Sequence, residues 1–73
     1  MDHLTGREML LVFAGVKGVP EDKCKAVTES LIQRVGLSSH ADNATKGYSG
    51  GNKRKLSMAL ALIGAPRLVF LVI

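Results

Sequence analysis

A serine and two glycines followed by three cations form the segment of this sequence best suited to chemistry. Residues 49–52 read Ser-Gly-Gly-Asn, and residues 53–55 read Lys-Arg-Lys. The first turn of a helix leaves backbone N–H groups without internal partners and carries the positive end of the helix dipole. Two glycines let a ligand approach that backbone closely. If a helix begins at Ser49, the segment therefore predicts a phosphate-binding loop.

The cations at 53–55 bear on this prediction, because an exposed cation in a first turn opposes the helix dipole at roughly 0.3 to 1 kcal/mol. A bound anion would offset that penalty. The alternative interpretation is a flexible helix cap followed by a solvated basic face. The chemistry of the loop alone favours the two interpretations equally.

The spacing of apolar residues places a helix directly after this loop, from Ser49 to about Gly64. Its buried face is predicted to comprise Leu56, Ala59, Leu60 and Ile63. Pro66 would end it, and the apolar run 68–73 predicts a strand inside a parallel sheet. A membrane span over 56–73 is the alternative, but a helix breaker and a charge interrupt its middle.

Two further helices are predicted upstream. The first begins at a capping box, in which the side chains of Thr5 and Glu8 satisfy free backbone N–H groups. The second begins near Pro20, a residue suited to the first helical position, and ends at Gly36. The apolar face of the first is predicted to be Met9, Val12, Phe13 and Val16. That of the second is predicted to be Cys24, Val27, Leu31 and Val35, with Ile32 beside it. Between 37 and 47 the sequence predicts a turn-rich connector in which Leu37 and Ala41 pack.

The composition predicts one small domain, since the chain has 73 residues, of which 47% are hydrophobic. Its single cysteine, Cys24, excludes an internal disulfide and a cysteine zinc site. His3 and His40 are isolated and flank no carboxylate cluster. Residues 1–42 hold five basic and six acidic residues, whereas residues 43–73 hold five basic residues and no acid. An anionic partner is therefore expected at the C-terminal part.

The stretch from Tyr48 to Leu71 resembles the signature helix of ATP-binding-cassette (ABC) ATPases running into the Walker B strand. The signature loop usually reads Leu-Ser-Gly-Gly-Gln, whereas residues 48–52 read Tyr-Ser-Gly-Gly-Asn and continue with Lys-Arg-Lys-Leu-Ser. That form resembles subfamily A, the lipid-transporting branch, and its second cassette in particular. Residues 4–8, Leu-Thr-Gly-Arg-Glu, resemble the segment after the Q-loop, so the resemblance covers nearly the whole chain.

The resemblance implies a fold class: a mostly α fragment of an α/β P-loop NTPase. Residues 1–73 would be a partial ABC ATPase domain. Its expected parts are a helical subdomain at about 5–47, a signature loop at 48–52, a signature helix at about 50–64 and a truncated Walker B β-strand at about 67–73.

The resemblance also implies a site that serves a nucleotide held by another chain or cassette. In this family two cassettes pair head to tail, and each signature loop faces the ATP bound by the partner. By this resemblance Ser49, Gly50 and Gly51 would contact the γ-phosphate, Asn52 would lie near the nucleotide, and the supporting residues would be Tyr48 and Lys55.

The parent family uses ATP and Mg²⁺, and this chain alone is expected to bind neither. Its expected partners are a second cassette and the transmembrane domains of the parent transporter, with a lipid substrate contacted indirectly and no nucleic acid. The expected location is the cytosolic face of a membrane, with no transmembrane segment in the chain itself.

Several parts of an ATPase site are missing from the sequence. No Gly-x-x-x-x-Gly-Lys-[Ser/Thr] motif occurs, and Val72 and Ile73 stand where the resemblance implies the Walker B acids. No catalytic or metal-binding residue is therefore assigned, and hydrolysis by the isolated chain is not expected. The resemblance predicts a partial gene product, a mispredicted gene or a pseudogene remnant.

Two other functions remain as alternatives. One is a catalytically inert helical fragment that binds a cassette and regulates or poisons it. The other is a small basic nucleic-acid-binding module, indicated by residues 53–55 and a pI near 9.7. The second is less favoured, because the chain lacks interleaved aromatic residues and a recognisable nucleic-acid-binding motif.

Overall fold

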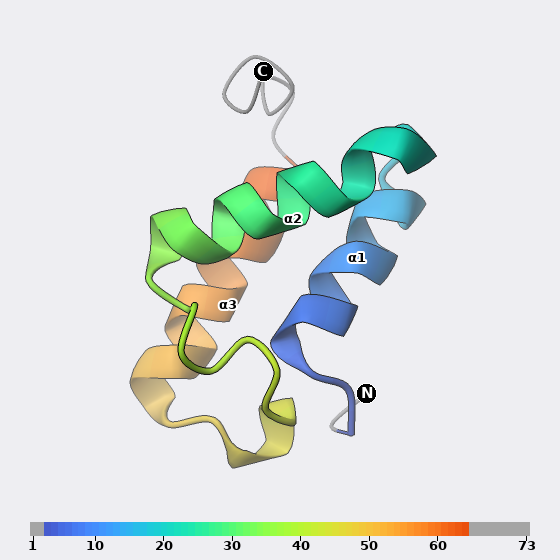
Figure 1. Ribbon diagram of the computed structural model, residues 1–73. Helices are drawn as coiled ribbons and strands as arrows, with labels where there is room; N and C mark the ends of the chain where they lie inside the picture. The colour runs from blue at the N-terminus through green and yellow to red at the C-terminus, as the bar shows by residue number, and fades with distance from the viewer. Residues whose placement is uncertain (1–2, 65–73) are drawn as a thin grey trace.

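The computed structural model describes residues 3–64, and three α-helices are the main elements of these residues (Figure 1). The helices are α1 (Gly6–Val16), α2 (Glu21–Val35) and α3 (Gly50–Ile63), and the 3-10 helix η1 (Thr45–Gly47) precedes α3. The only strand-like pairing within residues 3–64 is an isolated bridge between Thr5 and Ala44. The prediction of a mostly helical chain is confirmed. The predicted strand at about 67–73 and the stop at Pro66 lie outside the described residues.

The helix boundaries follow the capping signals in the sequence. The predicted capping box is present: the Thr5 hydroxyl accepts from the Glu8 N–H at 3.1 Å, and the Glu8 carboxylate accepts from the Thr5 N–H at 2.9 Å. Gly36 ends α2 in the left-handed conformation, with φ of 76°. The prediction that the second helix begins near Pro20 is confirmed: Pro20 is the N-cap of α2, and Glu21 is its first residue.

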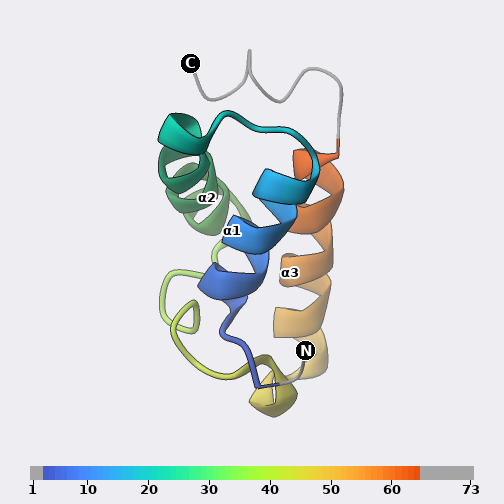
Figure 2. The ribbon, with the colours of Figure 1, turned by 90° about the vertical axis from the view of Figure 1, so that its right-hand side faces the viewer.

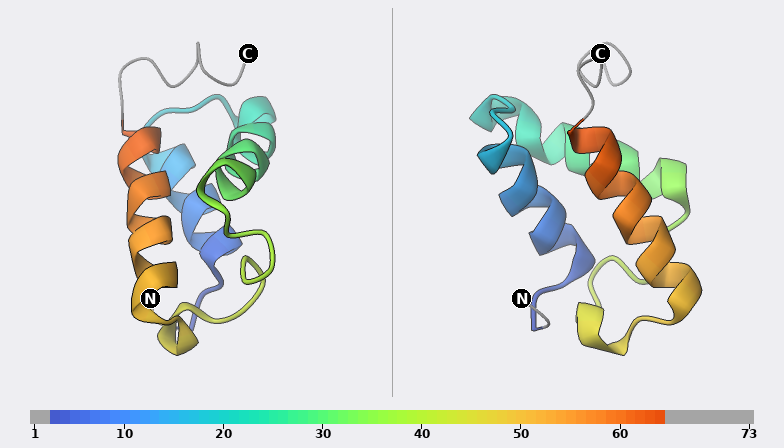
Figure 3. Two further views of the ribbon diagram at one scale, coloured as in Figure 1. Left: turned by 90° about the vertical axis from the view of Figure 1, so that its left-hand side faces the viewer. Right: turned by 180° about the vertical axis from the view of Figure 1, so that it is seen from behind.

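The helices α1 and α3 begin at the same end of the molecule, and α2 crosses them (Figures 1 and 2). The connector from α2 back to α3 passes the start of α1, as the view from behind also shows (Figure 3). Backbone hydrogen bonds fix this passage, because the Thr45 N–H donates to the Leu4 carbonyl and the Arg7 N–H donates to the Ala41 carbonyl, both at 2.9 Å. The starts of α1 and α3 are thus brought together by the connector.

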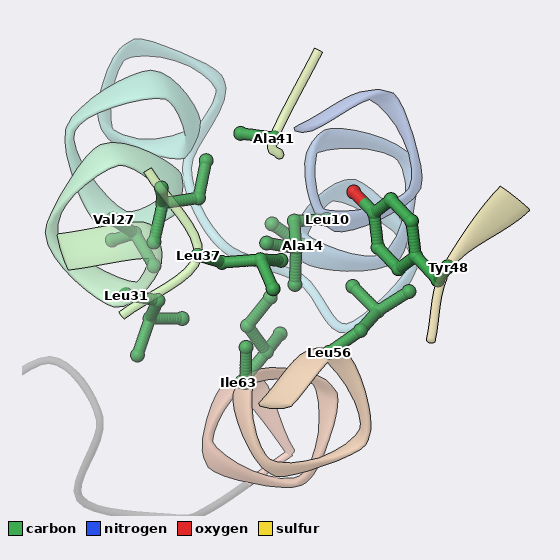
Figure 4. Packing of buried hydrophobic residues seen from close by; sticks show 11 residues of the cluster. Leu10, Ala14, Val27, Leu31, Leu37, Ala41, Tyr48, Leu56 and Ile63 are labelled. Carbon is green, nitrogen blue, oxygen red and sulfur yellow. The ribbon is translucent and has the colours of Figure 1, made fainter. Parts of the chain in front are cut away.

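The core lies between the three helices and the connector (Figure 4). Its buried hydrophobic residues are Leu10, Ala14, Val27, Leu31, Ile32, Leu37, Ala41, Tyr48, Leu56, Ala59 and Ile63. The predicted stripes of α2 and α3 are confirmed, with Cys24, Val35 and Leu60 only partly buried at their margins. The predicted packing of Leu37 and Ala41 is also confirmed, since neither is exposed.

The predicted apolar face of α1 was only partly right: Met9 and Phe13 are partly buried and pack against the core, but Val12 and Val16 do not. The buried residues of α1 are Gly6, Leu10 and Ala14, whereas Val12 and Val16 are 55% and 75% exposed. The stretch from 9 to 14 is apolar at every position, so two faces of the helix fit the same periodicity. The structure buries the face with the smaller residues, because Gly6 and Ala14 let neighbouring segments approach α1 closely.

No helix within residues 3–64 is both long and apolar enough to cross a bilayer. Within the same residues, no group of three or more histidine, cysteine or acidic side chains is arranged to hold a metal ion.

Candidate phosphate-binding loop

The loop at residues 48–52 forms the start of α3, as the sequence predicts. Ser49 is the N-cap in an extended conformation, and its hydroxyl oxygen accepts from the Asn52 N–H at 3.1 Å. The Ser49 carbonyl accepts from the Lys53 N–H at 2.9 Å. Ser49 therefore caps the helix while its side chain remains exposed.

The next two residues, Gly50 and Gly51, are not required by the fold of the chain. Neither has a positive φ. A Cβ atom built on Gly50 would meet nothing within 4 Å, and one on Gly51 would meet only the Ser49 hydroxyl oxygen, at 3.9 Å. Glycine inside a helix is nevertheless destabilising by roughly 0.5–1 kcal/mol relative to alanine. Nothing within residues 3–64 therefore explains glycine at these two positions.

The backbone N–H groups of the same two glycines are also available to a ligand. Among the described residues, neither Gly50 nor Gly51 has a hydrogen-bond partner for its N–H, and both residues are exposed. These are donors that the first turn of a helix leaves open. Together with the positive end of the dipole, they form a place where an oxyanion can accept two hydrogen bonds.

The three cations that follow do not share one surface. Lys53 and Arg54 are exposed beside the open donors, and the first turn of α3 contains no acid. Lys55 is half-buried, and its ammonium group donates to the Gly36 carbonyl at the end of α2, at 3.4 Å. A cation at that end complements the α2 dipole. The role predicted for Lys55 in supporting the loop remains a prediction, and its contact ties α3 to α2.

Tyr48 anchors the loop to the rest of the molecule. Its side chain is 7% exposed, and its hydroxyl donates to the His40 carbonyl at 2.6 Å. The ring lies against α1 and beside Leu56 (Figure 4). Burial raises the pKa of the Tyr48 phenol above 10.0, a hydrogen bond with the Gly6 backbone lowers it, and the charge of Asp42 raises it further. The phenol is therefore neutral at ordinary pH and available as a donor.

Sequence reasoning did not find the partners of Tyr48. His40 contributes its backbone carbonyl, which no residue pattern marks, and Gly6 contributes the space that the tyrosine occupies. The ion pairs of Arg7 with Asp42, at 2.9 Å, and with Glu29 were also not predicted from the sequence. These pairs link the start of α1 to the connector and to α2. Opposite charges far apart in sequence give no local signal, so only the fold reveals them.

A helix start with two open backbone donors beside exposed cations is suited to an oxyanion, and comparison with known proteins identifies the family of the chain. No protein-family profile matches the chain. The chain is 49% identical over 71 residues to mouse "Phospholipid-transporting ATPase ABCA3", which covers 97% of the chain and 4% of that protein. It is 56% identical over 70 residues to "Retinal-specific phospholipid-transporting ATPase ABCA4" of Bos taurus, covering 96% of the chain and 3% of that protein.

A more distant organism gives the same result. The chain is 48% identical over 68 residues to "ABC transporter A family member 2" of Dictyostelium discoideum, covering 93% of the chain and 4% of that protein. The chain is thus homologous over nearly all of its length to ABC transporters of subfamily A. It spans 3–4% of the length of these curated relatives.

Proposed function

We propose that the chain is a segment of the nucleotide-binding domain of a subfamily-A ABC transporter, within an α/β P-loop NTPase fold. In this proposal α1, α2 and the connector are the helical subdomain, residues 48–52 are the signature loop, and α3 is the signature helix. Two of the relatives are named phospholipid-transporting ATPases, which supports ATP-driven lipid transport as the activity of the parent protein. A second cassette and transmembrane domains would be its partners, at the cytosolic face of a membrane.

Within that parent, the loop would contact the γ-phosphate of an ATP molecule held by the partner cassette. The Ser49 hydroxyl and the N–H groups of Gly50 and Gly51 are the donors, and Asn52 would lie beside the nucleotide. One observation carries the assignment: two glycines leave exposed, unpaired donors at a helix start although no φ angle or internal contact requires glycine there. A phosphate that approaches the backbone closely explains the two glycines, and it would accept from the donors that the helix start leaves open.

The residues present fit a phosphate and not a metal ion. The first turn of α3 contains no acidic residue, and the exposed cations Lys53 and Arg54 would repel Mg²⁺. The partner cassette would therefore hold the nucleotide and its Mg²⁺, whose charge supports phosphoryl transfer. Residues 49–51 of this chain would orient the γ-phosphate and stabilise its charge with backbone and hydroxyl donors.

The proposal is tested by the affinity of the 73-residue chain for a subfamily-A cassette that has an intact Walker A loop. The cassette is measured once with bound Mg-ATP and once without nucleotide, by calorimetry or fluorescence anisotropy. We define the selectivity ratio as the affinity for the ATP-loaded cassette divided by that for the nucleotide-free cassette. A ratio of about ten or more is expected, because backbone donors to a charged phosphate are lost when ATP is absent.

A ratio of one would refute the phosphate contact. If the chain bound both forms equally, the alternative of an inert helical interaction fragment would be favoured. The exposed apolar residues Val12 and Val16 on α1 are the observation that supports this alternative. In that case Val16→Ser would weaken binding to both forms to the same extent.

A further inference from the structure

Tyr48 occupies the point where the start of α1, the connector and the start of α3 meet. It directly precedes Ser49, so any displacement of its backbone displaces the N-cap and the glycines that follow. We propose that Tyr48 is a positioning residue, whose contact with Gly6 sets where residues 49–51 present their donors. This inference rests on the proposed function, since a positioned donor matters only if a phosphate meets it.

The surface on which Tyr48 rests is held in place by other contacts. The Thr45 N–H donates to the Leu4 carbonyl, and the Arg7 N–H donates to the Ala41 carbonyl, so the backbones of the connector and the α1 start are joined directly. The guanidinium of Arg7 adds an ion pair to Asp42 at 2.9 Å. The Tyr48 hydroxyl then donates to His40 in the same connector, at 2.6 Å. The tyrosine is therefore docked on a body that is cross-linked independently of it.

Gly6 is the residue that allows this docking. It is buried in the first turn of α1 and has no positive φ, so the backbone conformation does not require glycine. A Cβ atom at Gly6 would overlap the Tyr48 hydroxyl oxygen, and it would lie 3.3 Å from Cζ of the ring and 3.4 Å from Leu37. An alanine at this position would therefore push the tyrosine, and the start of α3 with it, away from α1.

The loop itself has few other ties to the rest of the molecule. Within residues 49–52, the recorded contacts run from the Ser49 side chain and carbonyl to the next turn of α3. The next connection along α3 is the contact of Lys55 with Gly36, at 3.4 Å. Because Tyr48 lies immediately before the cap, its contacts with Gly6 and His40 have the most direct influence on where the loop lies.

The test introduces a steric clash between residue 6 and the Tyr48 hydroxyl, and then removes that hydroxyl. Gly6→Ala introduces the clash, and adding Tyr48→Phe removes the hydroxyl oxygen that would be overlapped. Gly15→Ala is the matched control, since it lies in the same helix and its Cβ would meet nothing within 4 Å. Amide signals of Gly50, Gly51 and Asn52 in the 73-residue chain are followed by two-dimensional ¹H–¹⁵N NMR. These signals are expected to move in Gly6→Ala, to return towards their original positions in the double variant, and to stay unchanged in Gly15→Ala.

The selectivity ratio distinguishes positioning from loss of folded protein. Partial unfolding lowers the affinity for both forms of the cassette by the same factor and leaves the ratio unchanged. Misplaced donors lower the ratio itself, and we expect a fall of about tenfold in Gly6→Ala, the effect of losing one hydrogen bond to a charged group. The double variant is expected to recover most of that loss.

The contrary outcomes are specific. Unmoved loop signals in folded Gly6→Ala, an unchanged ratio, or a double variant that recovers neither readout would each overturn the positioning role. If circular dichroism shows that Gly6→Ala is unfolded, Tyr48→Ala decides, because it removes the ring that contacts Gly6, and an unchanged ratio in that variant refutes the inference. A ratio of one for the original chain refutes the proposed function, whereas the NMR signals still report separately whether Gly6 and Tyr48 position the loop.

Discussion

The starts of α1 and α3 lie at the same end of the molecule, but they differ in how the free backbone N–H groups of the first turn are satisfied. At the start of α1 the free N–H groups are satisfied inside the molecule: Glu8 donates to the Thr5 hydroxyl, and Arg7 donates to the Ala41 carbonyl. The acid of the first turn, Glu8, also suits the helix dipole. At the start of α3 the cap is present, but two donors remain open and the first turn is free of acids.

The proposed function gives a reason for this difference: the start of α1 serves the stability of the helix, whereas the start of α3 would serve a ligand. The start of α1 combines a reciprocal capping box with an acid in the first turn, and both strengthen a helix start. The start of α3 has the Ser49 cap but no acid in its first turn, and Gly50, Gly51 and the cations Lys53 and Arg54 do not favour the helix. An anion that binds there would accept hydrogen bonds from the open N–H groups of Gly50 and Gly51, as the resemblance to a signature loop implies.

The largest expected effect comes from filling the space above the open donors. In the double variant Gly50→Ala/Gly51→Ala, methyl groups would hinder the approach of a phosphate to the backbone, and the selectivity ratio is expected to fall at least about tenfold. The free energy of unfolding is expected to rise by roughly 0.4–1 kcal/mol for each of the two substitutions, because neither Cβ meets a close neighbour. Binding measurements test the fall in the selectivity ratio, and urea unfolding tests the rise in the free energy of unfolding.

Gly15→Ala is the control for that variant, since it adds a methyl group to a helix glycine without close neighbours. It is expected to stabilise the chain by roughly 0.5–1 kcal/mol and to leave the selectivity ratio unchanged. A double glycine variant that behaved like Gly15→Ala in both measurements would remove the distinction between the two helix starts.

The next effect concerns the α1 start. Thr5→Ala deletes the hydroxyl that accepts from the Glu8 N–H, and loss of such a cap is expected to lower the free energy of unfolding by about 1 kcal/mol. The selectivity ratio should not change, because these donors already have partners within the chain. Urea unfolding monitored by circular dichroism measures the first quantity. A selective loss of affinity for the ATP-loaded cassette would show that the α1 start also takes part in binding.

The smallest effect comes from reversing one charge. Lys53→Glu places an acid near the positive end of the α3 dipole and is expected to raise the free energy of unfolding by roughly 0.3–1 kcal/mol. The same change should lower the affinity for the ATP-loaded cassette, most strongly at low salt. Lys25→Glu on α2 makes the same change in net charge at an exposed position away from the loop, and it should leave the selectivity ratio intact. Equal losses in the two variants would point to net charge alone.

Local signals in the sequence predict much of this fold. The Thr5–Glu8 capping box, the Gly36 stop and the Ser49 cap each depend on residues within four positions of one another, and the structure confirms all three. The buried face of α1 was predicted only in part, with Met9 and Phe13 at its margin, since the run of apolar residues at 9–14 fits two faces equally well. Only the position of Tyr48 and the connector decides that the face with Gly6 and Ala14 is buried.

The candidate site likewise has features that local sequence predicts and contacts that it does not predict. The open donors at Gly50 and Gly51 follow from helix geometry once the cap at Ser49 is known, so sequence reasoning finds them. The contacts that hold the loop in place join residues far apart in the chain: Tyr48 with Gly6, and Lys55 with Gly36. No local pattern marks such pairs, because each depends on how the connector folds back to α1.

The most direct measurement compares the two helix starts within one sample. The ¹⁵N-labelled chain is mixed with the subfamily-A cassette, first without nucleotide and then with Mg-ATP, and the amide signals of both starts are followed. A phosphate bound at the α3 start would shift the signals of Gly50 and Gly51 when ATP is added and leave those of Arg7 and Glu8 in place. Unshifted signals at Gly50 and Gly51, or larger shifts at Arg7 and Glu8, would contradict the assignment of the phosphate to α3.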